Sequence, residues 1–263
     1  METHRLMAQG RPKRDLATTA ALQKLASIER AGLKQLPKPN RIKAQSHAVT
    51  AVPEQLTPAS GAAPGLAASL PVIGDSLELI RQEVAACHCC PELASTRTQT
   101  VFGVGNPQAR LCFVGEAPGA DEDLKGEPFV GRAGQLLTKI IEACTLSRSE
   151  VYILNVLKCR PPSNRNPLPD EVAHCRGFLD RQLKLIQPEY ICCLGTIAAQ
   201  TLLQTDTPIS RLRGKFHEYQ GISVMCTYHP AYLLRNPSAK KEVWADMKVL
   251  MRRLGIELES SAS

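Results

Sequence analysis

Apolar residues form four short, continuous runs in the part of the chain after residue 76. Each run is six or seven residues long and rich in valine, isoleucine, leucine and cysteine, without the strict alternation of a half-buried strand. Runs of this kind are typical of strands that are buried on both faces of a sheet. They are 110–115, 151–157, 190–195 and 222–227.

Segments with helical spacing of their apolar residues separate and flank these runs. Alternating strands and helices are typical of a parallel sheet covered on both faces. The sequence therefore predicts an α/β fold, in which a central, mostly parallel four-stranded sheet is flanked by helices. The predicted helices are 77–84, 133–144, 170–186, the segment that begins at 196, and 238–254.

Polar, chemically active residues follow three of the predicted strands. In open α/β sheets, ligands bind beyond the carboxyl ends of the strands, and this rule selects the segments after Gly115, Ile153 and Thr227. Each polar residue there has an ordinary explanation by itself, such as a solvated loop carboxylate for Glu116 or a satisfied buried amide for Asn155. Gathered at one end of one sheet, these residues indicate a functional site.

The composition changes before the predicted domain. Residues 51–71 are rich in alanine, proline, serine and glycine, which is typical of a flexible linker. Residues 1–50 hold ten Lys or Arg and three Asp or Glu, so the whole net charge of +7 lies there. Such an arm indicates an additional contact with DNA or with a protein; a solvated leader without function and an organelle-targeting segment are the alternatives. We predict a disordered extension over 1–75, one domain over 76–256 and a short tail over 257–263.

Hydropathy and cysteine usage bear on location. The sequence has no run of about eighteen apolar residues, so no membrane span is predicted. The chain opens without a secretory signal, and ten cysteines in such a chain indicate reduced thiols or metal ligands and not a disulfide framework. We expect a monomeric protein in the cytoplasm, associated with the nucleoid.

Four of the cysteines have the spacing of metal ligands. Cys87 and Cys90 form a close pair, and fifteen residues separate Cys159 from Cys175. One close pair with two distant thiols can form a four-thiolate shell around an iron–sulfur cluster, whereas zinc modules usually present two close pairs. The spacing therefore favours iron–sulfur over zinc. Ordinary burial is the remaining alternative, and it suits the cysteines in apolar runs, which are Cys112, Cys192, Cys193 and Cys226.

Four longer motifs resemble those of the family 4 uracil-DNA glycosylases, the iron–sulfur members of the uracil-DNA glycosylase superfamily. The resemblance covers about residues 76–254 and implies an enzyme that flips uracil out of DNA and hydrolyses its N-glycosidic bond. The product would be an abasic site for base excision repair, and the implied partner is uracil-containing DNA. The motifs are GEAPGADED (115–123), PFVGRAG (128–134), YILNVLKCRPPSNRNP (152–167) and HPAYLLRNP (229–237).

The same resemblance implies a [4Fe-4S] cluster with a structural role. The cluster would join the segment after the second predicted strand to the first helix of the domain. That segment carries Arg160 and Arg165, which we expect to contact DNA. Cys89 crowds the close pair and is an alternative to Cys90 as a ligand. The implied ligands are Cys87, Cys90, Cys159 and Cys175.

The resemblance also implies a pocket for an extruded base, because an enzyme that acts on a base must take it out of the duplex. Phe129 provides an aromatic face for stacking. Asn155 accepts from uracil N3–H and donates to O4, a pattern that cytosine reverses. The resemblance implies that His229 donates to uracil O2 as negative charge develops on the leaving base. It also implies that Glu116 positions the attacking water and stabilises the cationic sugar.

Two further residues complete the implied substrate-binding set. They are Ala117 and Glu122, and the resemblance puts Glu122 near uracil C5, where it helps to exclude the methyl group of thymine.

The segment after the implied histidine is expected to enter the DNA. Similar loops in the superfamily insert an apolar side chain into the gap that the flipped base leaves. Of Leu233 and Leu234, we expect one to act as this wedge and the other to pack against the last helix. Arg235 is expected to contact DNA.

A protein that binds or traps uracil-DNA without turnover is the alternative within the superfamily. Relatives that bond covalently to DNA carry an inserted basic loop with a histidine after the second strand. This chain has CRPPSNRNP (159–167) there, without a histidine, and it retains Glu116. Both features favour turnover. A metal-dependent nuclease is disfavoured because no carboxylate cluster is present to supply a second metal site.

Overall fold

The computed structural model describes residues 74–258. All of them fall within one compact unit, Ala68–Ser263. The basic arm, the linker and residues 259–263 lie outside the described residues, so the disordered extension and the domain boundaries stay predictions. Among the helices described, none combines the length and the hydropathy that crossing a bilayer requires.

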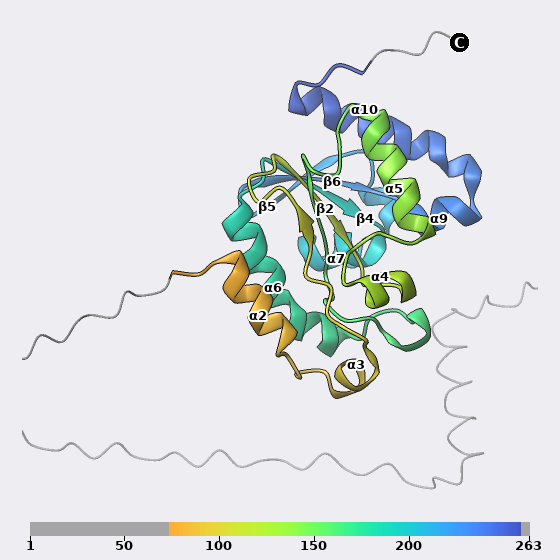
Figure 1. Ribbon diagram of the computed structural model, residues 1–263. Coiled ribbons are helices and arrows are strands. Elements are labelled where there is room, and N and C mark those ends of the chain that lie inside the picture. Colours follow the sequence, from red (N-terminus) through yellow and green to blue (C-terminus); the bar gives the residue numbers. More distant parts are fainter. Residues whose placement is uncertain (1–73, 259–263) are drawn as a thin grey trace, which may run out of the picture. The chain divides into compact units, whose positions relative to one another are not determined.

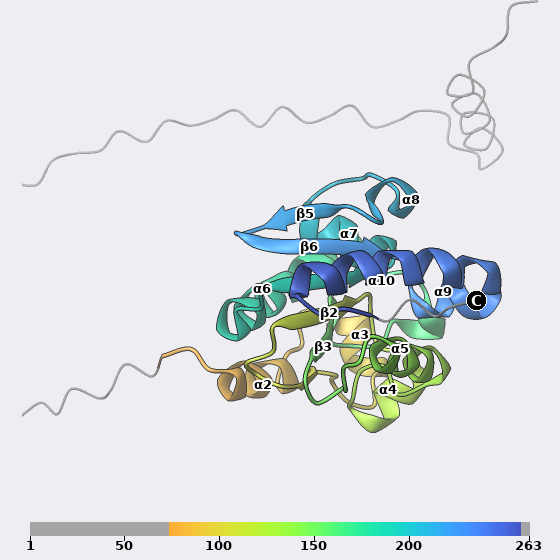
Figure 2. The ribbon, with the colours of Figure 1, turned by 90° about the horizontal axis from the view of Figure 1, so that it is seen from above.

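A six-stranded sheet forms the centre of the fold (Figures 1 and 2). The strand order is β1-β3-β2-β4-β6-β5. The four inner strands run parallel to one another and correspond to the four predicted strands. They are β2 (Leu111–Gly115), β3 (Tyr152–Asn155), β4 (Tyr190–Leu194) and β6 (Ile222–Thr227).

Two edge strands show that the prediction of a four-stranded sheet is wrong. β1 (Val104–Gly105) pairs antiparallel with β3, and β5 (Phe216–Tyr219) pairs antiparallel with β6. β1 is two residues long, and β5 includes a histidine and a glutamate. Neither strand has the continuous apolar run that marks an inner strand, since edge strands are only partly buried.

The predicted helices are confirmed, with ends that differ by one or two residues. The first begins after Ser76, whose hydroxyl accepts from the N–H of Leu79 at 3.1 Å, a common way to satisfy the first turn. Four short helices, α3, α4, α8 and α9, lie where the sequence predicts connections. In chain order the helices are α2 (Leu77–Ala85), α3 (Pro91–Thr96), α4 (Ala120–Lys125), α5 (Arg132–Ala143), α6 (Pro169–Ile186), α7 (Thr196–Leu203), α8 (Ile209–Leu212), α9 (Pro230–Arg235) and α10 (Lys240–Leu254).

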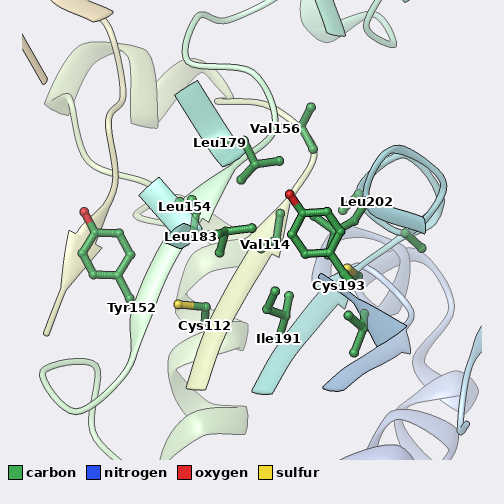
Figure 3. Close-up of a cluster of buried hydrophobic side chains, with 14 of the residues drawn as sticks. Cys112, Val114, Tyr152, Leu154, Val156, Leu179, Leu183, Ile191, Cys193 and Leu202 are labelled. Atoms are coloured by element: carbon green, nitrogen blue, oxygen red, sulfur yellow. The ribbon is translucent and has the colours of Figure 1, made fainter. Parts of the chain in front are cut away.

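Helices cover both faces of the sheet. Successive side chains of a strand point to opposite faces, so each inner strand contributes to two hydrophobic cores. On one face, α6 and α7 pack on the strands, with Val114, Ile191, Leu183 and Leu202 among the buried residues (Figure 3). On the other face the cover is α5, α9 and α10, and the buried residues include Phe113, Ile153, Leu137, Leu233 and Met247.

The carboxyl ends of β2, β3 and β6 lie at one edge of the sheet. Gly115 is the register partner of Asn155 in the β2–β3 pair, and Thr227 ends β6. The short helices α4 and α9 follow β2 and β6, and Figure 1 shows both beside α5. The three segments that the sequence selects for function are therefore adjacent in space.

Candidate active-site cleft and cysteine cluster

A cleft of about 410 Å³ opens at the carboxyl ends of β2, β3 and β6. Both predicted catalytic residues, all four predicted substrate-binding residues and two of the predicted DNA contacts line it. These are Glu116, His229, Ala117, Glu122, Phe129, Asn155, Arg165 and Arg235. The predicted DNA contacts Arg160, Leu233 and Leu234 are not among its lining residues.

Asn155 ends β3 and is 2% exposed. Its backbone carbonyl accepts from Nζ of Lys158 at 2.8 Å, and this bond helps to fix the position of the residue. Its side-chain oxygen Oδ1 is buried and has no hydrogen-bond partner within the described residues. A buried amide oxygen without a partner costs about 1–3 kcal/mol, so this atom is an acceptor available to a ligand in the cleft.

Gly115 allows the side chains of Asn155 and Phe129 to pack closely at the base of the cleft. A Cβ at this position would overlap Asn155 Oδ1 and lie 2.5 Å from the Phe129 ring. Only a residue without a side chain lets strand β2 pass this close to both groups. The amide and the aromatic ring therefore lie side by side because of a glycine.

Phe129 adopts a left-handed backbone conformation, with a φ angle of 55°, and is 6% exposed. Such a conformation costs a non-glycine residue about 1–2 kcal/mol, so the surroundings must enforce it. Arg148 does so by donating to the carbonyl oxygens of Phe129 at 3.2 Å and Pro128 at 2.9 Å. Gly134 packs against the Phe129 backbone so closely that a Cβ would overlap it.

Glu122 holds the loop that carries Phe129. Its carboxylate accepts from three backbone N–H groups, those of Gly119 at 3.0 Å, Val130 at 2.9 Å and Gly131 at 3.0 Å. The contact that follows from this geometry is with the protein backbone. A role beside uracil C5 stays a prediction for this residue.

His229 is kept neutral with its proton on Nε2. Burial, together with the smaller effect of the charge of Arg235, lowers the pKa of His229 to about 4. Nδ1 accepts from the backbone N–H of Ala231 at 3.1 Å, so in the neutral ring the proton resides on Nε2. The imidazole centroid lies 5.5 Å from that of the Phe129 ring.

Glu116 directly follows β2 and is half-buried. Its backbone carbonyl accepts from the N–H of Leu157 at 3.0 Å, which extends the β2–β3 ladder past the strands and fixes Glu116 next to Asn155. Burial raises the pKa of Glu116 above its usual range. Within residues 74–258 the carboxylate forms no ion pair, so it faces the cleft as an uncompensated charge.

The two leucines of α9 lie differently. Leu233 is 1% exposed and packs in the core formed with α5 and α10, whereas Leu234 is 39% exposed. Leu233 is therefore the packing residue of the pair, which leaves Leu234 as the candidate for the wedge. Tyr232, which the sequence does not single out, is 38% exposed and lines the cleft.

The two predicted DNA-binding arginines differ in their partners. Arg165 donates to Glu171 at 2.6 Å and to Glu92 at 2.8 Å. Its guanidinium thus ties the segment after β3 to α6 and α3. Arg160 donates to Asn164 Oδ1 at 2.8 Å and forms no ion pair with a described residue. Both roles in DNA binding stay predictions.

The four predicted ligand cysteines lie within electrostatic range of one another. The pKa of Cys175 is raised to about 11, chiefly by burial; a backbone hydrogen bond and the charge of Lys158 oppose this effect, and Cys159 and Cys87 act in the raising direction. Burial also raises the pKa of Cys90 to about 12, and the charges of Cys175, Glu171, Cys159 and Cys87 act in the same direction. Thiols with raised pKa values become thiolates when a metal centre supplies positive charge.

Two basic side chains adjoin these thiols. Arg97 donates from Nη1 to the sulfur of Cys159 at 3.1 Å. Lys158 is 1% exposed, and its Nζ donates to the backbone carbonyls of Asn155 at 2.8 Å and Phe102 at 3.3 Å. Burial lowers the pKa of Lys158 to about 7, and the charge of Cys175 opposes that effect. The surroundings are therefore suited to an anionic centre.

Within the described part of the chain, no three Cys, His, Asp or Glu side chains converge as the ligands of a single ion. Each thiolate of a four-iron cluster binds a different iron, so its four sulfurs are spread more widely than the ligands of one ion. Cys89 is exposed, and its pKa is raised chiefly by a hydrogen bond with Cys87. Of the two candidates for the second ligand, Cys90 is less exposed than Cys89. The sulfur of Cys90 lies 3.4 Å from Nδ1 of His174.

Comparison with known proteins identifies the family of this chain. The sequence model of the uracil DNA glycosylase superfamily matches residues 102–248. The matched span contains every residue that lines the cleft, together with Cys159 and Cys175.

Three similar proteins are named type-4 uracil-DNA glycosylase. The one from Archaeoglobus fulgidus is 48% identical over 182 residues, which cover 66% of this chain and 91% of that protein. The one from Sulfurisphaera tokodaii is 44% identical over 191 residues (69% and 86%), and that from Thermotoga maritima is 44% identical over 164 residues (62% and 85%). The chain belongs to the uracil-DNA glycosylase superfamily and, within it, to the type-4 group.

Proposed function

We propose that this chain excises uracil from DNA by hydrolysing its N-glycosidic bond, which leaves an abasic site. The observation that carries the proposal is the buried, unpartnered Oδ1 of Asn155 on the floor of the cleft. An acceptor in that position selects a base that offers a donor to it. Uracil has such a donor at N3–H, and the relatives named above act on uracil by name.

Discrimination against cytosine follows from the amide of Asn155. The side chain accepts from uracil N3–H through Oδ1 and donates to O4 through Nδ2. Cytosine presents an acceptor at N3 and a donor at C4, so both contacts would be mismatched. A site that leaves buried polar groups unpaired rejects the wrong base strongly.

The leaving base is stabilised by the neutral imidazole of His229. Its Nε2–H donates to uracil O2 while negative charge develops there, and the neutral ring needs no proton transfer to do so. The Phe129 ring provides the stacking face for the flipped base. Because loop contacts fix both rings before any ligand binds, they need little reorganisation in the reaction.

Glu116 supplies the negative charge on the sugar side. The carboxylate orients the attacking water and stabilises the cationic sugar. Ala117, the next residue, is half-buried at the cleft wall, where a small side chain leaves room for the substrate.

DNA is engaged by side chains of α9 and of the segment after β3. Leu234 fills the gap that the extruded base leaves in the stack. Arg235 and Arg160 contact phosphates. Every group in this scheme comes from one chain, so we propose that the protein acts as a monomer. It would work wherever the cell's DNA is held, which agrees with the expected association with the nucleoid.

We further propose that a [4Fe-4S] cluster is bound by Cys87, Cys90, Cys159 and Cys175. When bound, the cluster supplies cross-linking of chain segments and no step of the hydrolysis. Its ligands come from the segment between α2 and α3, from the end of the β3 segment and from α6. It would thus hold the backbone that carries Arg160 against the rest of the domain.

The test of the activity is uracil release from a uracil-containing oligonucleotide under single-turnover conditions. We expect Asn155→Ala and His229→Ala each to slow release by roughly two or more orders of magnitude, because each removes a group aimed at the reacting base. DNA affinity is expected to fall much less. A wild-type protein that binds uracil-DNA tightly but never releases uracil would instead support the non-turnover alternative.

The cluster has its own test, which does not depend on activity. Anaerobically purified protein is expected to be brown and to contain about four irons per chain. Cys175→Ser is expected to lose iron. The control is Cys192, a fully buried cysteine of β4, and the Cys192→Ser variant is expected to keep its iron. Zinc-loaded, colourless protein with full activity would rule out the cluster.

A further inference from the structure

A buried carboxylate on α10 holds the strand end that leads to His229. Asp246 is 2% exposed, and the fully buried hydroxyl of Thr227 donates to its Oδ2 at 2.6 Å. Thr227 is the last residue of β6, two positions before His229. The position of the strand end is thus set by a directional bond and not by apolar packing alone.

Arg213 completes this arrangement from a third segment of the chain. Its Nη2 donates to Asp246 Oδ1 at 2.8 Å, its Nε donates to Oδ2 at 3.1 Å, and Nη2 also donates to the carbonyl of Glu242 at 2.7 Å. A bidentate arginine–carboxylate pair fixes orientation as well as distance. We call Thr227, Arg213 and Asp246 the Asp246 network.

The Asp246 network also reaches the rim of the cleft. The guanidinium of Arg213 lies 5.2 Å from the centroid of the Tyr228 ring, and that ring lies 4.9 Å from the ring of Tyr232, which lines the cleft. His229, which lines the cleft, and Tyr228, which stacks on Tyr232, therefore follow directly from a strand end that the network holds.

The backbone of the same strand end is also held by Gly195, the residue that follows β4. The N–H of Gly195 donates to the carbonyl of Thr227 at 2.9 Å. Gly195 has a φ angle of 91°, and a Cβ there would lie 3.0 Å from Cβ of His229. His229 thus follows a strand end that is held in two ways. Gly195 binds the backbone of Thr227, and Asp246 binds its side chain.

We propose that Asp246 is a positioning residue for His229, which it aligns with the substrate through the hydroxyl of Thr227. This inference rests on the proposed function, because it assigns His229 a contact with the leaving base. Asp246 itself does not line the cleft and takes no part in bond breaking. A misplacement of a reacting or stabilising group by about 1 Å can lower a rate by roughly a hundredfold, so a residue of this kind matters to the rate without touching DNA.

The decisive variant is Thr227→Val, which keeps the shape of the side chain and removes the donor. We expect the single-turnover rate of uracil release to fall by roughly tenfold to a hundredfold, with little change in DNA affinity. Thr227→Ser restores the hydroxyl and is expected to retain most of the rate. Thr227→Ala, which also removes the donor, provides a second route to the same measurement if the valine variant folds poorly.

Destabilisation alone is controlled by Val224→Ala on the same strand. Val224 is fully buried and belongs to the opposite face of the sheet, so its truncation is expected to lower the melting temperature without changing the rate at a temperature well below melting. If Thr227→Val likewise lowers only the melting temperature, Asp246 is merely structural and the inference is wrong.

A double-mutant cycle separates action through His229 from a general effect. In a His229→Ala background, Thr227→Val is expected to change the remaining rate by less than about twofold, because the group that it positions is already absent. An undiminished effect in that background would overturn the inference. The imidazole ¹⁵N shifts of His229 give a readout that needs no activity: they are expected to move in Thr227→Val and not in Val224→Ala. If the wild type released no uracil while these shifts still moved, the failure would lie with the proposed function.

Discussion

Leu233 and Leu234 are adjacent in the chain, yet Leu233 is 1% exposed and Leu234 is 39% exposed. Of these two leucines, α9 thus presents Leu234 to solvent, and the next residue in the chain, Arg235, lines the cleft. Leu234→Ala is expected to reduce uracil release from double-stranded DNA by roughly tenfold while sparing single-stranded DNA, where no base stack has to be filled. Single-turnover assays on matched single- and double-stranded oligonucleotides measure this difference.

Leu233→Ala is the matched control. It is expected to destabilise the fold by about 2–5 kcal/mol because it leaves a cavity in the core, and to affect both substrates alike. Equal losses on both substrates for Leu234→Ala would show that this residue does not act as a wedge.

Gly115→Ala is expected to abolish most of the activity with little loss of DNA binding. The added Cβ would overlap Asn155 Oδ1 and press on the Phe129 ring, so the base could no longer be both stacked and hydrogen-bonded. We expect the rate of uracil release to fall by at least roughly tenfold.

The control for this glycine is Gly177→Ala on the exposed side of α6. A Cβ at Gly177 meets no atom within 4 Å, and alanine favours a helix interior by about 0.5–1 kcal/mol. The control is expected to raise the melting temperature and leave the rate unchanged. Normal activity in Gly115→Ala would mean that the floor of the cleft can shift to accept a methyl group.

The rate of uracil release is expected to fall on the acid side with an inflection above the usual pKa of a glutamate. Burial raises the pKa of Glu116, and the working form is the carboxylate, so activity is lost as the pH drops through that raised value. His229 has a pKa of about 4 and works as a neutral ring. Its protonation therefore adds a second loss only near pH 4.

A pH–rate profile of wild type and Glu116→Gln tests both assignments. The variant is expected to be slow and nearly independent of pH down to about pH 5. An inflection near 6.5, the ordinary pKa of histidine, that survives in the variant would show that His229 is not held neutral.

Removal of residues 1–73 is expected to leave single-turnover cleavage at saturating enzyme nearly unchanged. The truncated chain should bind DNA more weakly at low salt, and the slope of log affinity against log salt should become shallower, because fewer phosphates are neutralised. The motive is the excess positive charge of residues 1–50. Fluorescence anisotropy across a salt series measures the slope, and an unchanged slope would favour a protein partner for the arm.

The inner strands could be predicted because burial on both faces leaves a continuous apolar run. The segments that converge on the cleft followed from the rule about the carboxyl ends of parallel strands. The edge strand β5 could not be found in this way, since Phe216–Tyr219 includes His217 and Glu218 and is only partly buried.

Contacts between residues that are far apart in the chain could not be predicted from the sequence. The DNA contact expected of Arg165 stays a prediction, but its motif does not reveal that Glu92, which lies 73 positions away, accepts from its guanidinium. The role expected of Glu122 beside the base stays a prediction, but its motif does not reveal that the carboxylate accepts from three backbone N–H groups. Arg148 has no motif of its own, and only the folded chain shows that it holds the Phe129 loop. Such pairings are set by tertiary packing and leave no local pattern.

The strained backbone of Phe129 has a consequence for how the protein surveys DNA. Arg148, Glu122 and Gly134 fix the loop in the folded chain, so the entropy of ordering the aromatic face is lost once, during folding, and not at each encounter. Ordering costs that are met in advance do not weaken binding. Each extruded base therefore meets an aromatic face that is already ordered. A wrong base can then be rejected within the lifetime of a brief encounter.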